Sequence, residues 1–164
     1  MTDSLAQRAA RVRLAVFDVD GVLTDGRLYI GPHGEALKAF HVHDGYGLKA
    51  LMRAGVEVGL LTARSSAIVV ARAQELGIAL VAQGAADKAA VLTTWMRERA
   101  LDPAAVSYLG DDLPDLAPMA LVGLPAAVAN AHAHVRAAAC YVTRRGGGRG
   151  AARELCELLL GART

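Results

Sequence analysis

Two aspartates separated by one valine follow an apolar run near the start of the chain, in the stretch V-F-D-V-D-G-V-L-T-D-G. Desolvating a carboxylate costs several kcal/mol unless something compensates its charge. If the backbone remains extended, Asp18 and Asp20 project from the same side of the chain. Two such carboxylates ionise together only beside a cation; otherwise one of them keeps a proton. The pair can therefore supply a metal-held nucleophile and a proton donor.

Three more acids, Asp111, Asp112 and Asp115, stand close together in the stretch L-G-D-D-L-P-D. Oxygen-rich sites without thiolates select hard cations, so Mg²⁺ is the expected ion. Thr62 adds a hydroxyl and Lys88 adds an ammonium group. A carboxylate nucleophile that approaches a phosphate dianion needs such positive charge. The whole set predicts phosphoryl transfer through an aspartyl-phosphate intermediate.

Each of these features also has an ordinary interpretation when it is taken separately. A D-x-D pair can form a turn, Thr62 can begin a helix, and Lys88 can be a solvated surface residue. The D-D-L-P-D cluster can cap a helix whose dipole favours negative charge. Their common position directly after predicted strands favours the catalytic interpretation.

The elements that position these residues are strands and helices in alternation. Strands are predicted at Arg13–Phe17, Val56–Leu61, Ile78–Ala82, Val106–Leu109, Leu121–Ala129 and Tyr141–Thr143, with a hairpin formed by Arg27–Ile30 and Ala36–Val42. Helices are predicted at Gly47–Arg53, from a cap at Ser65 to Leu76, and at Asp87–Ala100, Leu113–Met119, Ala131–Ala138 and Ala151–Leu160.

This alternation predicts one α/β domain over residues 1–164, a three-layer sandwich with a mostly parallel, Rossmann-like sheet. Such sheets bind ligands at the carboxyl ends of their strands. Asp18, Thr62, Arg64 and Asp111 all lie at such ends in the predicted order.

Composition narrows the classes of partner and compartment. The formal net charge of the 164 residues is +2, which does not indicate a nucleic-acid-binding surface. No apolar run approaches the ~18 residues of a membrane span. Cys140 and Cys156 lack the spacing of a metal site or a disulfide framework. We therefore expect a cytoplasmic protein with free thiols that binds neither nucleic acid nor membrane.

The stretches D-V-D-G-V-L-T-D-G, L-L-T-A-R and G-D-D-L-P-D, together with the Lys88 helix, resemble the four motifs of the haloacid dehalogenase phosphatase superfamily. The resemblance implies that Asp18 is the nucleophile and Asp20 the general acid and base. It also implies that Asp18, the backbone carbonyl of Asp20 and Asp111 bind Mg²⁺.

The same resemblance assigns the remaining polar residues of the motifs. Thr62 and Lys88 would hold the phosphoryl group. Asp112 and Asp115 would orient the lysine and the water molecules bound to the metal.

A closer resemblance covers nearly the whole chain. The stretches F-H-V-H-D-G-Y-G-L, Q-G-A-A-D-K, Y-L-G-D-D-L-P-D and Y-V-T-R-R-G-G-G-R-G are similar to 3-deoxy-D-manno-octulosonate 8-phosphate phosphatases. That resemblance implies a capless homotetramer in which the hairpin, a flap near residues 28–40, helps to assemble the subunits. A neighbouring subunit would then help to close each active site.

The resemblance also implies the substrate, a small phosphorylated sugar acid of lipopolysaccharide precursor synthesis. Residues expected to contact this substrate are His41, Val42, His43, Asp44, Gly45, Lys49, Arg64, Arg72 and Lys88. His43 and Lys49 stand where the family often has arginine, and Ala63 stands where it commonly has glycine. Lysine and histidine are less suited than arginine to bind a carboxylate through two parallel hydrogen bonds.

Three other functions remain open on the sequence. Phosphatases of nonulosonate 9-phosphates are close relatives, but they often have glutamate at the position of Arg64, which favours the eight-carbon substrate. A phosphoacceptor signalling domain uses similar groups in a different order along the chain. An inactive scaffold would not require the intact acids and Lys88.

Some polar residues outside the motifs have no assigned chemistry. His33, His132 and His134 are expected at the surface. The G-G-G-R-G run that begins at Gly146 lacks the residues of a phosphate-binding P-loop. We interpret it as a flexible connector, or alternatively as a basic tail near a neighbour's active site.

Overall fold

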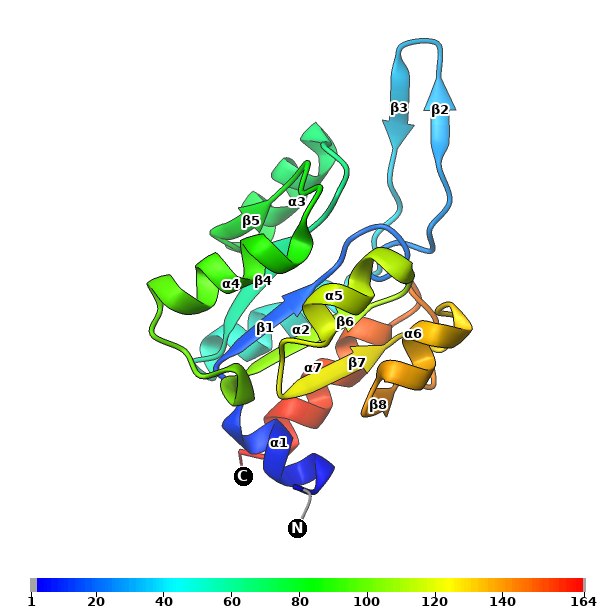
Figure 1. Ribbon diagram of the computed structural model, residues 1–164. Helices are drawn as coiled ribbons and strands as arrows, with labels where there is room; N and C mark the ends of the chain where they lie inside the picture. The colour runs from blue at the N-terminus through cyan, green and yellow to red at the C-terminus, as the bar shows by residue number, and fades with distance from the viewer. Residues whose placement is uncertain (1–2, 164) are drawn as a thin grey trace.

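Six parallel strands form one continuous sheet in the computed structural model, which describes residues 3–163 (Figure 1). The strand order across the sheet is β5-β4-β1-β6-β7-β8. The strands are β1 (Leu14–Phe17), β4 (Glu57–Leu61), β5 (Leu80–Ala82), β6 (Val106–Gly110), β7 (Leu124–Ala127) and β8 (Tyr141–Val142). Each neighbouring pair runs parallel, which confirms the predicted sheet.

Strand β1 lies at the centre of the sheet, between β4 and β6. All four of its residues are buried, as expected for a strand that is covered on both faces. Phe17, its last residue, is in register with Leu60 of β4 and Leu109 of β6. The three strands therefore end almost level, and the loops that follow them begin side by side.

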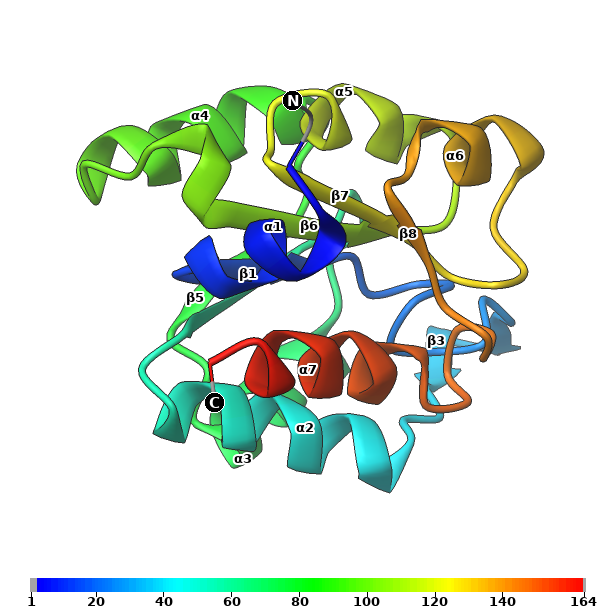
Figure 2. The same ribbon diagram turned by 90° about the horizontal axis from the view of Figure 1, so that it is seen from below.

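Helices cover both faces of the sheet, so the fold is the predicted three-layer sandwich (Figure 2). One layer contains α2 (Val42–Arg53), α3 (Ala67–Leu76) and α7 (Ala151–Gly161). The other contains α4 (Lys88–Glu98), α5 (Leu116–Met119) and α6 (Ala133–Ala138). Two short 3₁₀ helices, Pro103–Ala105 and Leu113–Asp115, precede β6 and α5.

The core is made mainly of alanine, valine and leucine, and aromatic residues are few. Trp95 of α4 is the single tryptophan of the chain, and it is buried against Gly59 of β4. A methyl group at Gly59 would stand 3.0 Å from the Trp95 ring, so this glycine lets α4 lie close to the sheet.

A two-stranded hairpin, β2 (Tyr29–Gly31) and β3 (Gly34–Leu37), projects from the carboxyl end of the sheet (Figure 1). Several of its large apolar side chains are about half exposed or more within residues 3–163: Ile30 is 63% exposed, Leu28 51% and Leu37 48%. The hairpin is predicted from the sequence, but its second strand ends at Leu37 rather than at Val42.

Helix α2 begins five residues before the predicted start at Gly47. His41 is its N-cap and accepts a hydrogen bond from the His43 N–H. Gly45 lies before the predicted start, yet both Gly45 and Gly47 lie in the helix, and neighbouring side chains leave little room for a Cβ atom at either position. Gly47 faces Arg153 and Cys156 of α7, so the glycine allows the two helices to pack closely.

Two further predictions differ in detail from the structure, and one helix was not predicted. The N-cap of α3 is Ser66 rather than Ser65, and the Ser66 side chain makes no capping bond. Helix α1 (Leu5–Arg11) was not predicted, although Ser4 and Gln7 form a capping box at its start. Strand β7 is limited to Leu124–Ala127 within the longer predicted region.

The glycine-rich run after β8 is packed and hydrogen-bonded, so the flexible-connector interpretation was wrong. The Gly147 N–H donates to Asn130 Oδ1 at 2.9 Å, and the Gly148 N–H donates to the Val22 carbonyl at 2.9 Å. A Cβ atom at Gly147 would overlap the carbonyl group of Gly21. This close approach explains why glycine is needed there, and it braces the loop that follows β1.

Candidate active site

The polar residues of the motifs lie together at the carboxyl end of the sheet. They line a cavity of about 260 Å³, which opens between the loops after β1, β4 and β6. Its lining consists of Asp18, Asp20, Gly26, Thr62, Ala63, Arg64, Lys88, Asp111, Asp112, Pro114 and Asp115. The level strand ends place these residues side by side, as the parallel sheet predicts.

Lys88 lies at the centre of this arrangement, in the first turn of α4. Asp87 caps the helix by accepting a hydrogen bond from the Ala90 N–H at 2.9 Å, so the helix begins at Lys88. The buried Lys88 ammonium donates to Asp18 Oδ1 and to Asp115 Oδ1, both at 2.7 Å. Burial lowers the pKa of Lys88, but Asp18 and Asp115 outweigh that effect and raise it. Lys88 therefore remains charged at neutral pH.

Asp115 accepts hydrogen bonds at both of its oxygens. Lys88 and the Tyr108 hydroxyl donate to Oδ1 at 2.7 Å each, and the N–H groups of Asp111 and Asp112 donate to Oδ2 at 2.9 and 3.2 Å. An ionised carboxylate has about four acceptor positions, so these four donors occupy all the acceptor positions of Asp115. This residue is therefore suited to hold Lys88 rather than to bind a metal directly.

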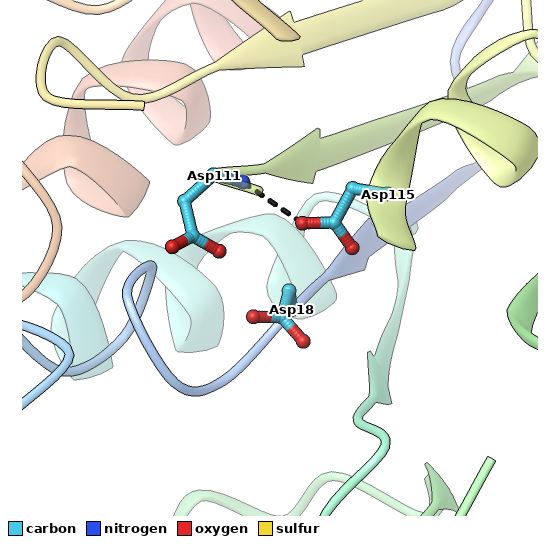
Figure 3. A group of neighbouring side chains, drawn as sticks. All are labelled: Asp18, Asp111 and Asp115. Carbon is cyan, nitrogen blue, oxygen red and sulfur yellow. Dashed lines mark hydrogen bonds between the residues drawn. The ribbon is translucent and has the colours of Figure 1, made fainter. Parts of the chain in front are cut away.

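Asp18, Asp111 and Asp115 turn their carboxylates toward one another (Figure 3). One oxygen from each lies within 4.8 Å of the others. Burial, together with the charge of Asp115, raises the pKa of Asp18 to about 7 against the opposing effect of Lys88. Burial and the charges of Asp18 and Asp115 raise the pKa of Asp111 to about 8. The single Lys88 ammonium therefore does not neutralise the cluster.

The donor set fits a magnesium ion. The cluster offers carboxylate oxygens and no thiolate or imidazole, which is the ligand chemistry that hard cations prefer. Asp111 receives no side-chain hydrogen bond from any residue in the described range 3–163, so its oxygens remain available. With Asp115 filled, Asp18 and Asp111 are the two side chains suited to ligate the ion.

The loop after Asp18 requires a glycine. Gly21 has a φ of 97°, in the left-handed region, and a Cβ atom there would overlap the Asp111 carboxylate. Thr24 holds the loop from within, because its Oγ1 accepts from the N–H groups of Gly21 and Gly26 at 3.2 Å each. The D-V-D-G-V-L-T-D-G stretch thus folds as one compact turn beside the acids.

Thr62 and Arg64 follow β4 at the wall of the cavity. Thr62 is buried, and its Oγ1 accepts from the Arg64 N–H at 3.2 Å. The Thr62 hydroxyl proton remains available to an anion in the cavity. Arg64 is exposed and borders the same cavity, so its charge can reach a bound ligand.

The other predicted substrate contacts lie outside this cavity within a single subunit. His41 borders a neighbouring cavity with Asp25 and Arg149, whereas His43 borders another with Arg145 and Arg153. None of the remaining candidates lines the acid cavity: Val42, Asp44, Gly45, Lys49 and Arg72.

Two of these candidates, Asp44 and Arg72, make contacts within the subunit that explain their positions. Asp44 is buried and accepts from the Arg153 N–H at 2.8 Å, at the start of α7, and burial raises the pKa of its carboxyl. Arg72 pairs with Glu75 at 2.8 Å and lies over the Phe40 ring. Gly45 is held close to the Arg72 side chain.

Sequence reasoning missed three residues around the cavity. Tyr108 lies inside β6, where a buried aromatic residue is interpreted as part of the core. Its hydroxyl, however, donates a hydrogen bond to Asp115. Lys38 and Glu35 belong to the hairpin and form ion pairs beside Asp20. No local pattern links the hairpin to Asp20, because the contact spans a turn and a long separation in sequence.

A family model described as haloacid dehalogenase-like hydrolase matches residues 68–155. The 3-deoxy-D-manno-octulosonate 8-phosphate phosphatase of Yersinia pestis is 46% identical over 160 residues, which cover 98% of this chain and 86% of that protein.

Two solved structures are similar along nearly the whole chain. A probable yrbi family phosphatase of Pseudomonas syringae is 51% identical, with a TM-score of 0.95 over 97% of this chain and 90% of the other. The second is a 3-deoxy-D-manno-octulosonate 8-phosphate phosphatase of Moraxella catarrhalis in complex with a magnesium ion, a phosphate ion and a KDO molecule. It is 41% identical, with a TM-score of 0.94 over 97% of this chain and 91% of the other.

Proposed function

The chain belongs to the haloacid dehalogenase-like hydrolases and, among them, to the 3-deoxy-D-manno-octulosonate 8-phosphate phosphatases, and from this membership we propose its reaction. The protein is a Mg²⁺-dependent phosphatase that converts 3-deoxy-D-manno-octulosonate 8-phosphate into the free sugar acid and inorganic phosphate. The observation that carries this conclusion is the Lys88 ammonium held between Asp18 and Asp115, beside the open carboxylate of Asp111.

Asp18 is the nucleophile in this proposal. Its carboxylate attacks phosphorus, an O–P bond forms, and the bond from phosphorus to the sugar oxygen breaks. Asp20 gives its proton to the departing sugar oxygen. Asp20 then accepts a proton from a water molecule that attacks the aspartyl-phosphate, which releases phosphate and restores Asp18.

Lys88 and Thr62 bind the phosphoryl oxygens. Lys88 already lies within hydrogen-bond distance of Asp18, so its charge stands beside the attacking group. Asp115 keeps Lys88 in that position, with the Tyr108 hydroxyl and two backbone N–H groups holding Asp115 in turn.

Asp18, Asp111 and the backbone carbonyl of Asp20 would hold Mg²⁺, which supplies positive charge that offsets repulsion between the nucleophile and a phosphate dianion. Asp112 caps the short helix after β6 through its bond to the Leu113 N–H at 2.8 Å, and we assign it a role in orienting water molecules near the ion.

The sugar-acid end of the substrate lies beyond the acids, toward Arg64. Arg64 supports the eight-carbon substrate over a nonulosonate 9-phosphate, because phosphatases that act on nonulosonate esters often have glutamate at this position. His41, Val42, His43, Asp44, Gly45, Lys49 and Arg72 remain candidates for contacts within an assembled oligomer.

We also propose a homo-oligomer, a tetramer, in the cytoplasm. The exposed apolar side chains of the hairpin support assembly, since contiguous apolar surface marks interaction sites. Both cysteines are free thiols, which is typical of a reducing compartment. Among residues 3–163, no helix combines the length and the apolar character needed to cross a bilayer.

The direct test measures phosphate release from the octulosonate 8-phosphate and from a nonulosonate 9-phosphate, with Mg²⁺ and with a chelator. We expect the larger kcat/KM for the eight-carbon ester and no turnover in chelator. Asp18→Asn should lower kcat by about four orders of magnitude or more, since it removes the nucleophile. Near-normal turnover by that variant, or a stable phosphoprotein without continuing phosphate release, would overturn the proposal.

A further inference from the structure

Lys38 is a buried cation that the proposed reaction leaves unused. It follows β3 at the base of the hairpin, and only 3% of its side chain is exposed. A buried ammonium group is tolerated when carboxylates pair with it. Lys38 has two such partners: it forms ion pairs with Asp20 Oδ1 and, at 2.8 Å, with Glu35 Oε1.

Glu35 connects Lys38 to a second loop of the site. Its other oxygen accepts a hydrogen bond from the Ser66 hydroxyl, and the Ser66 N–H donates to Gln83 Oε1 at 2.8 Å. Ser66 stands at the start of α3, shortly after Thr62 and Arg64. A continuous polar chain therefore links the loop after β1, the hairpin and the loop after β4.

The two oxygens of Asp20 have different surroundings. Oδ1 is held by Lys38, whereas Oδ2 is buried and has no hydrogen-bond partner among residues 3–163. Asp20 also lines the acid cavity. A carboxyl group that is held at one oxygen cannot rotate freely, so the contact with Lys38 fixes the orientation of Asp20.

We propose that Lys38 is the positioning residue for Asp20 in the reaction. Lys38 holds Oδ1, and Glu35 and Ser66 hold Lys38, so the carboxyl group of Asp20 is kept in one orientation for proton transfer to the departing sugar oxygen. This inference rests on the proposed function, and it adds that the hairpin contributes directly to the orientation of the general acid.

The leaving group separates this role from simple anchoring of the hairpin. An alkoxide needs a proton as it departs, whereas p-nitrophenolate is a weak base and leaves without one. The value of kcat/KM reports the steps up to the first irreversible one, which is release of the leaving group. If Asp20 is wrongly oriented, kcat/KM should therefore fall for the sugar ester and remain nearly unchanged for p-nitrophenyl phosphate.

The experiment compares kcat/KM for both esters in the wild type, Lys38→Met and Lys38→Arg. General acid catalysis contributes about 10²–10⁴-fold, so Lys38→Met should lower kcat/KM for the sugar ester by about 10- to 100-fold. The value for p-nitrophenyl phosphate should change by less than about threefold, and Lys38→Arg should recover part of the loss. Arg27→Met, at an exposed arginine before the hairpin, is the control for removal of a charge and should leave both values unchanged.

A double-mutant cycle with Asp20→Asn gives a second readout. If Lys38 acts through Asp20, Lys38→Met should add less than about threefold to the loss already caused by Asp20→Asn. If Lys38→Met does not fold, as judged by its circular dichroism, Glu35→Gln takes its place, because it loosens Lys38 and should give the same contrast between esters.

Equal losses on both esters, no loss on either, or additive effects in the cycle would overturn the role of Lys38. Failure of the proposed function is a separate outcome, because it appears in the wild type. If the wild type rejects the octulosonate ester but hydrolyses another alkyl phosphate, the same comparison is made with that ester.

Discussion

At the scale of single residues, the site depends on how one ammonium group is shared among several carboxylates. Lys88 pairs with Asp18 and Asp115, while Asp111 has no cationic partner among the described residues. Asp115 is filled by four donors, so it fixes Lys88 without competing for the metal. The three acids therefore have different roles although they lie within 4.8 Å of one another.

Replacement of Asp115 by asparagine tests this division of roles. The amide nitrogen cannot accept, so at least one buried donor loses its partner, at a cost of about 1–3 kcal/mol. We expect a lower melting temperature and a lower kcat/KM, because Lys88 is no longer held at both sides. Thermal unfolding and phosphate-release assays measure the two effects.

Asp112→Asn is the matched control for stability, since Asp112 is exposed and its side chain caps the short helix Leu113–Asp115, a role that asparagine also fills. Its melting temperature should fall less than that of Asp115→Asn. Equal effects of the two substitutions would show that burial and the four donors do not distinguish Asp115.

At the scale of elements, the hairpin is not stabilised by packing of its strands against the hydrophobic core. Its two strands pair only with each other, and Leu28, Ile30 and Leu37 are largely exposed in the single subunit. An isolated two-stranded hairpin is marginally stable in water. We therefore expect a second copy of the chain to cover its apolar side chains.

Ile30→Asp should weaken the assembly, since a charge in an apolar contact is costly to desolvate. Light scattering after size-exclusion chromatography should show a smaller species than the wild type at the same concentration. Val70→Asp, at an exposed apolar residue of α3, is the control and should leave the assembly intact. An unchanged mass for Ile30→Asp would exclude the hairpin as an essential contact.

The sequence predicts the elements around the first acids well, because buried strands and the residues after them carry strong patterns. It fails where distant contacts decide the local structure. The predicted helix begins at Gly47, but α2 also includes Gly45, which packs closely against Arg72 of α3. The G-G-G-R-G run suggests flexibility, but Gly147 is packed against Gly21. Lys38 and Asp20 likewise meet only in the folded chain.

At the scale of the whole molecule, the acid cluster should make stability depend on pH and on metal together. The folded-state pKa values of Asp18 and Asp111, about 7 and about 8, lie above their ordinary values. Between the ordinary and the raised values, the metal-free native state binds more protons than the unfolded chain. Its stability should therefore fall as the pH rises from about 4 to about 8.

Magnesium should reverse this loss, because it binds the ionised carboxylates of the native state. At a hundredfold excess over Kd the gain is about 2.7 kcal/mol, or about 5–10 °C in melting temperature. We expect a larger increase at about pH 8 than at about pH 5.5, where protons compete for the same oxygens. Asp111→Asn should remove most of the difference, and an equal increase at both pH values would contradict the assignment of the ligands.

The single tryptophan gives the protein a built-in optical reporter. Trp95 lies seven positions after Lys88 in α4, so both side chains lie on the same face of one helix. If α4 moves when Lys88 binds an anion, the contact of the indole ring with Gly59 would change. We therefore expect intrinsic fluorescence to change when phosphate binds if α4 moves, and to stay constant if it does not.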